Sequence, residues 1–165
     1  MISADYCRLM AHYNTWQNTS LVTAADTLSD AARHKDRGAF FRSIAATLNH
    51  LYWADALILQ RLQGNERPED TVKHSLTSPS DWERFKTMRL RRNQDIEDWA
   101  APLIDADLEG TVVWYPGDGT RRIEALKALC VVELFNHQVH HRGQIHAMLT
   151  AAGAEPEPTN LSMLP

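Results

Sequence analysis

The sequence has few cysteines, no surplus of positive charge and no long hydrophobic run, and each absence argues against a class of protein. Its two cysteines, Cys7 and Cys130, lack the close spacing of a redox or zinc motif, which favours reduced thiols. The formal net charge of −4 gives no general attraction to nucleic acids or acidic membranes. No apolar stretch approaches the roughly 20 residues that span a bilayer, and the first residues do not resemble a secretory signal. We therefore expect a soluble, cytoplasmic protein.

The remaining composition is that of an ordinary globular protein. A chain of 165 residues with 44% hydrophobic residues is long enough to bury a substantial core. The sequence shows no internal repeat, low-complexity tract or linker. We therefore predict a single domain over residues 1–165, in which residues from about 154 to 165 form an extended tail along the surface.

Four long segments have hydrophobic residues at steps of three and four, separated by short breaks rich in proline, glycine and serine. They predict helices over about 3–30, 36–63, 81–101 and 123–152. Before the last helix, β-branched residues flank a Pro-Gly-Asp-Gly turn and predict a short hairpin or extended crossover. Four such helices in so short a chain must pack side by side, so the predicted fold is an all-α four-helix bundle.

The last helical segment, with the string ELFNHQVHHRGQIHAML, holds four of the eight histidines in the chain. On a helical wheel, His137, His141 and Gln144 lie inside the apolar stripe, His140 lies at its edge and His146 lies on the opposite face. His137 and His141 are one turn apart and therefore neighbours. Two inward-facing imidazoles either bind one metal ion or are core residues that bond carboxylates or water. The spacing leaves both interpretations open.

Two residues of the second predicted helix are further candidates. His50 borders the polar side of this helix, so periodicity predicts a partly exposed side chain that could supply a third ligand. Asp55 lies near the middle of the apolar stripe, where a carboxylate needs a partner. That partner is either a ligand imidazole, which Asp55 would orient, or a side chain of the first helix such as Tyr13 or Asn14.

Three polar residues of the last helix are candidates for supporting roles. Glu133 lies one turn before His137, where it could accept the second ring N–H of that histidine or pair with an arginine. Gln144 faces inward and could bind a ligand or a backbone group. Arg142 points away from the apolar stripe, which predicts a structural or interfacial role.

The basic stretch ERFKTMRLRRNQ in the third helix raises the question of nucleic-acid binding. It is followed by the acidic string DIED, and Phe85 is its one aromatic residue. This pattern favours a solvated helix face rather than a nucleic-acid surface. The remaining histidines, which have no comparable context and are expected at the surface or rim, are His12, His34 and His74.

The strings HYNTWQN, LNHLYWAD and NHQVHHRGQIHAML, in the first, second and last helices, resemble the DinB-like (damage-inducible) family of metalloenzymes, and the resemblance covers nearly the whole chain. It implies a bundle of up-down-down-up order with a divalent metal held by three histidines. On this resemblance His50 matches the ligand of the second helix, and His137 and His141 match the pair of the last. The wheel selects the pair independently, whereas His50 rests mainly on the resemblance. The family often forms homodimers, so we expect a homodimer.

The resemblance also frames the function. Relatives include thiol-dependent transferases and proteins with no assigned activity. We expect a metal-dependent enzyme that acts on a small molecule, either a transferase that uses a low-molecular-weight thiol or a hydrolase. The sequence has no obvious general base beside the histidine pair, which counts against a hydrolase. The alternatives are a non-catalytic metal-binding stress-response bundle and a helical interaction module with a polar core. Zn, Ni and Fe all suit three histidines, so the donor set does not identify the metal.

Overall fold

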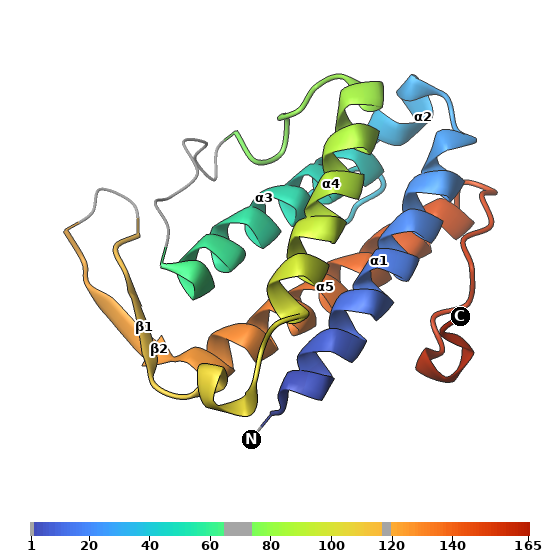
Figure 1. Cartoon of the computed structure of the whole chain (residues 1–165). Coiled ribbons are helices and arrows are strands. Elements are labelled where there is room, and N and C mark those ends of the chain that lie inside the picture. The colour runs from blue at the N-terminus through green and yellow to red at the C-terminus, as the bar shows by residue number, and fades with distance from the viewer. Residues whose placement is uncertain (1, 65–73, 117–119) are drawn as a thin grey trace.

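Four long helices pack side by side in the computed structural model, which describes residues 2–64, 74–116 and 120–165 (Figure 1). They are α1 (Ala4–Asp26), α3 (Ile44–Gln63), α4 (Trp82–Ala100) and α5 (Lys127–Thr150). α1 and α5 run in one direction and α3 and α4 in the other, so the predicted all-α bundle of up-down-down-up order is confirmed. α5 packs against both α1 and α3, and α1 also packs against α4.

Side-chain caps begin three of the long helices. The hydroxyl groups of Ser3 and Ser43 and the carboxylate of Asp81 each accept a hydrogen bond from the backbone N–H three residues further on. Such bonds satisfy donors that the first helical turn leaves unpaired. Gly64 ends α3 with a φ of 69°, a left-handed conformation that glycine adopts without strain.

The first two helices are shorter than predicted. α1 ends early, and a separate short helix, α2 (Asp30–His34), begins at its cap Ser29. α3 begins late, after its cap Ser43, because Gly38 and Arg42 both have a positive φ that no α-helix accommodates. Hydrophobic spacing continues across these breaks, so periodicity alone does not reveal them.

A hairpin precedes the last helix, as predicted. β1 (Thr111–Trp114) and β2 (Ile123–Leu126) pair antiparallel, with the first residue of β1 opposite the last of β2 (Figure 1). Because residues 123–126 pair with β1, α5 begins at Lys127, and the predicted start at 123 is wrong. The predicted turn at 117–119 and part of the predicted loop, 65–73, lie outside the described residues.

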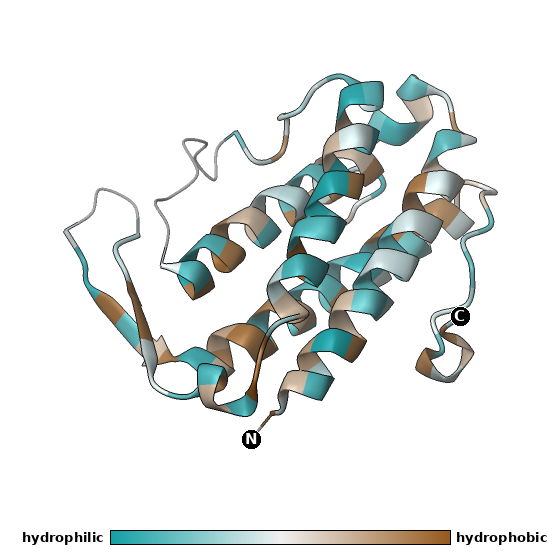
Figure 2. Ribbon diagram, in the orientation of Figure 1, coloured by the Kyte–Doolittle hydropathy of each residue, from teal (hydrophilic) through white to brown (hydrophobic). Residues whose placement is uncertain are grey.

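The hydrophobic core has two parts separated by polar residues. One part lies toward the hairpin and the other toward the opposite end of the bundle. Hydrophilic and hydrophobic residues alternate every few positions along the long helices, as in helices with one face buried (Figure 2). Between the two parts, each long helix contributes buried polar side chains, which we call the polar layer; it consists of Asn14, Gln17, Asn18, Asp55, Arg89, Asn93, Gln138, His141 and Arg142.

The chain after α5 runs back along α1. The turn at Gly153, with a φ of 83°, directs it away from the helix axis. The hydroxyl of Tyr13 donates to the carbonyl of Thr159 at 2.7 Å, and Gln17 donates to the carbonyl of Pro158 at 2.9 Å. Two short 3₁₀ helices, Asp105–Leu108 and Leu161–Met163, complete the described elements. No described helix is both long and apolar enough to cross a membrane.

Candidate metal centre

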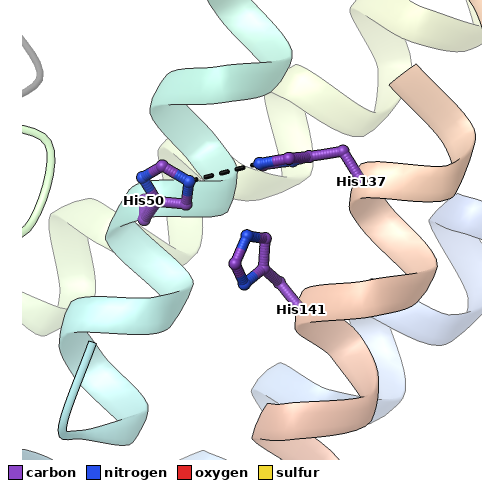
Figure 3. A group of neighbouring side chains, drawn as sticks. All are labelled: His50, His137 and His141. Carbon is purple, nitrogen blue, oxygen red and sulfur yellow. Dashed lines mark hydrogen bonds between the residues drawn. The ribbon is translucent and has the colours of Figure 1, made fainter. Parts of the chain in front are cut away.

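Three histidines face one another between α3 and α5 (Figure 3). His50 extends from α3, and His137 and His141 extend from successive turns of α5. The Nε2 atoms of His50 and His137 are 3.2 Å apart. One candidate ligand nitrogen from each ring lies within 4.8 Å of the other two. The structure therefore brings together the three histidines that the sequence analysis selects.

His50 is more buried than its helix predicts. Its exposed fraction is 8%, whereas the wheel predicts a partly exposed side chain. Phe41, which precedes α3, packs on the imidazole with ring centroids 4.1 Å apart. Ser75, from the segment after α3, places its hydroxyl 3.5 Å from the Nδ1 of His50. Both neighbours come from outside the helix, so periodicity within α3 could not show them.

The environment keeps the three imidazoles uncharged at neutral pH. Burial, as the main cause, and the nearby His137 and His141 together lower the pKa of His50 to about 4. Burial is also the main cause of the lowered pKa values of His137 and His141. An uncharged imidazole has a lone pair on one nitrogen, which is the form that binds a metal ion.

Gln144 fixes the orientation of His141. Its Oε1 atom lies 2.8 Å from the Nδ1 of His141, so this nitrogen donates the hydrogen bond and the lone pair falls on Nε2. The side-chain nitrogen of Gln144 also lies 3.3 Å from the Nε2 of His140. Gln144 thus faces the site as predicted, but it binds a histidine rather than a backbone group.

Glu133 does not play the first of its two predicted roles, that of an acceptor for His137, and its exposed position fits the alternative of a carboxylate at the rim. Its side chain is exposed, and the Nδ1 atom of His137 is buried without a hydrogen-bond partner in the described part of the chain. One turn of helix separates Glu133 from His137, but its position on α5 points the carboxylate toward solvent rather than toward α3. The expectation that Glu133 accepts the second N–H of His137 is therefore wrong.

Asp55 is fully buried, as its position in the apolar stripe predicts, but its partner is different. Its Oδ2 atom accepts a hydrogen bond from the Nη1 of Arg89 at 2.6 Å, not from Tyr13 or Asn14. Arg89 belongs to the basic stretch predicted to be solvated, and this prediction is wrong for Arg89 because α4 turns it toward α3. The Oδ1 atom of Asp55 is buried and has no partner among the described residues.

Arg142 is also inside the bundle, although the wheel turns it away from the apolar stripe. It donates to the side-chain oxygen of Asn14 and stacks over the ring of Tyr13 at 5.1 Å. Burial lowers its pKa to about 10. Arg142 lies off the apolar stripe, as predicted, and it is buried there because α5 packs on α1 as well as on α3, so two faces of this helix are buried. Its contacts with α1 fit the structural role, one of the two that were predicted. The fully buried Gln138, which the sequence analysis missed, lies on the same second face.

His140 is exposed beside the site, as its position at the edge of the stripe predicts. Its ring centroid is 4.8 Å from that of His141, yet it does not join the cluster of three. The remaining predicted surface histidines, all exposed, are His12, His34 and His74.

An up-down-down-up bundle with a three-histidine cluster between two of its helices defines a helical protein with a candidate metal centre. Comparison with known proteins agrees with this class. The sequence model of the DinB family matches residues 1–165, and the chain belongs to this family. The chain is also similar to Protein DinB of Bacillus subtilis (strain 168), with 23% identity over 172 residues that cover 97% of this chain and 94% of the relative.

Proposed function

We propose that His50, His137 and His141 hold one divalent metal ion and that the protein is a metal-dependent enzyme acting on a small molecule. The observation that carries this proposal is the convergence of three uncharged imidazoles from two helices, with candidate ligand nitrogens within 4.8 Å of one another. Three clustered imidazoles, of which those of His50 and His141 are buried and that of His137 is half-buried, leave nitrogen lone pairs unsatisfied without a shared cation or proton, which is costly.

The spacing of the nitrogens supports a metal. Two imidazole nitrogens bound to one zinc ion at about 2.0–2.1 Å with tetrahedral angles lie about 3.3 Å apart. The Nε2 atoms of His50 and His137 are 3.2 Å apart. His141 already directs its proton to Gln144, so its Nε2 is available as a third ligand.

The second nitrogen of His141 supports the same assignment. A histidine that binds a metal usually donates its other N–H to an acceptor. Gln144 is that acceptor for His141. For His137 the described residues supply no such acceptor, because its Nδ1 is buried without a hydrogen-bond partner. The charge of Asp55 acts on His137, opposing the effect of burial on its pKa.

The contacts of the three histidines favour thiol chemistry over hydrolysis. Zn, Ni or Fe held by three histidines would keep positions open and would lower the pKa of a bound thiol or water. Hydrolysis would also need a nearby base, and in the described residues no carboxylate has a hydrogen bond or ring contact with the three histidines. Their contacts of this kind outside the cluster are Phe41, Trp53, Ser75, His140 and Gln144. We therefore propose transfer of a low-molecular-weight thiol to an electrophile.

Elemental analysis of protein purified without a histidine tag tests the metal centre. His137→Ala and His141→Ala should each lose most of the bound metal, because each removes one of three ligands. The matched control is His140→Ala, which removes an exposed imidazole beside the site and should leave the metal content nearly unchanged. A parent protein that stays metal-free after dialysis against Zn and Ni would refute the metal centre. Loss of metal in His140→Ala but not in His141→Ala would refute the ligand assignment.

A screen of low-molecular-weight thiols with electrophilic substrates, run with and without chelator, tests the activity. Turnover that a chelator abolishes and added metal restores would support the enzyme. Stable metal binding without turnover would instead favour a non-catalytic metal-binding bundle.

A further inference from the structure

A tight turn formed by residues 39–42, which we call the aromatic turn, lies directly beside the histidines. Phe41 packs on the rings of His50 and His141, with centroid distances of 4.1 Å and 5.3 Å. Phe40 meets Phe41 edge-on at 4.8 Å, and 80% of Phe40 is exposed. Aromatic rings therefore run in unbroken contact from the imidazoles to the solvent.

The backbone holds the aromatic turn in place. The amide of Arg42 donates to the carbonyl of Ala39 at 2.8 Å, and the amide of Arg37 donates to the carbonyl of Arg42 at 2.8 Å. The guanidinium of Arg42 pairs with Asp36 at 3.0 Å. Arg42 has a φ of 67°, which is strained for a residue with a side chain and persists only where the surroundings impose it. These contacts hold the backbone of the aromatic turn, and Phe40 lies on its exposed side.

Folding does not explain the position of Phe40. It is the most exposed of the large hydrophobic side chains in the described residues, and leaving so much apolar surface in water forgoes stabilisation that burial would give. Ile104, the next most exposed of these side chains at 63%, lies elsewhere, at the start of the 3₁₀ helix Asp105–Leu108. Residues with strained backbone conformations cluster at active sites and ligand-binding segments, and Arg42 of the aromatic turn is such a residue.

We infer that the aromatic turn is a wall of the substrate site and selects small molecules that carry an aromatic or other flat apolar group. This inference rests on the proposed metal centre. A substrate whose polar head reaches the imidazole nitrogens can lay its ring against Phe40, because aromatic groups pack favourably edge-on or offset. Small-molecule sites commonly combine an apolar wall with a few convergent polar groups, and here the histidines are those groups. In the proposed transfer reaction, the electrophile carries the ring.

Two hydroxamates test the aromatic turn in the full-length protein loaded with cobalt. Benzohydroxamate and acetohydroxamate chelate a metal through the same atoms and differ in the phenyl group. Titration followed by the visible absorption of cobalt should show tighter binding of benzohydroxamate. Phe40→Ala should weaken benzohydroxamate binding about 3- to 10-fold, equivalent to about 0.7–1.4 kcal/mol. The same variant should leave acetohydroxamate binding and cobalt content unchanged, because Phe40 makes no ring contact with the histidines.

Two further variants complete the test. Phe40→Tyr should keep the preference for benzohydroxamate, since it retains the ring. Ile104→Ala removes an exposed apolar side chain elsewhere and should have no effect. If the cobalt-loaded protein binds both hydroxamates with equal affinity, the inference is overturned. The same holds if Phe40→Ala and Ile104→Ala weaken benzohydroxamate binding equally. Neither result would contradict the metal centre. A protein that takes up no cobalt would refute the metal centre, and the inference with it.

Discussion

The buried ion pair between Asp55 of α3 and Arg89 of α4 should make a large contribution to the stability of the bundle. Asp55 is 0% exposed and Arg89 is 2% exposed, and their charged atoms are 2.6 Å apart. Asp55→Ala leaves a buried guanidinium without its counter-ion, and one of its nitrogens, Nη2, already lacks a partner among the described residues. Breaking a buried pair in this way costs about 3–5 kcal/mol. For a chain of 165 residues, that loss lowers Tm by about 6–20 °C.

Urea unfolding followed by circular dichroism, with chelator present so that metal does not contribute, measures this loss. A double variant, Asp55→Leu with Arg89→Met, provides the control. It replaces both charges with apolar groups of similar size, so it should recover most of the stability that Asp55→Ala loses. A loss of less than about 1 kcal/mol of unfolding free energy in Asp55→Ala would contradict the large contribution of the buried pair. A double variant whose loss equals the sum of the losses in Asp55→Leu and Arg89→Met would show that the two residues are not coupled.

Three other predictions concern the site and the assembly. With metal removed by chelator, the free energy of unfolding should fall as pH decreases from about 6.5 toward 4. In this range the unfolded chain protonates His50 near its ordinary pKa, whereas in the folded protein the pKa of His50 is about 4 and the imidazole stays uncharged. The loss of unfolding free energy that is due to His50 should approach about 3 kcal/mol. Urea unfolding at each pH should show a weaker pH dependence of stability in His50→Asn. An unchanged pH dependence would show that His50 is not the group responsible. Gln144→Ala should weaken zinc binding about 10-fold or more in a competition titration, because it removes the acceptor that orients His141. The control Glu133→Gln should leave zinc affinity unchanged. Equal effects of the two variants would show that Gln144 does not orient His141. The family resemblance also predicts a homodimer, and analytical sedimentation that finds only monomer at micromolar concentration would count against it.

Several features of the fold follow from the sequence alone because they depend on neighbouring residues. The cap at Asp81 and the stop at Gly153 rest on residues within a few positions along the chain, and the strands of the hairpin are joined by one short connection. The placement of His137 and His141 on one inward face depends only on the period of the helix. Each of these features can be predicted from one segment of the sequence, without knowing which helices are neighbours in the fold.

The surroundings of the site were decided by the tertiary structure. Asp55 and Arg89 are 34 positions apart, and Arg142 and Asn14 are 128 positions apart. A wheel drawn for one helix assigns it one buried face, but α5 packs on two neighbours, and this buries Arg142 on a second face. His50 becomes buried only because residues before and after α3 fold over it. The sequence therefore determines which side chains can face inward along each helix. Packing between distant segments determines which of these side chains meet, because every buried contact needs two surfaces and these come from different parts of the chain.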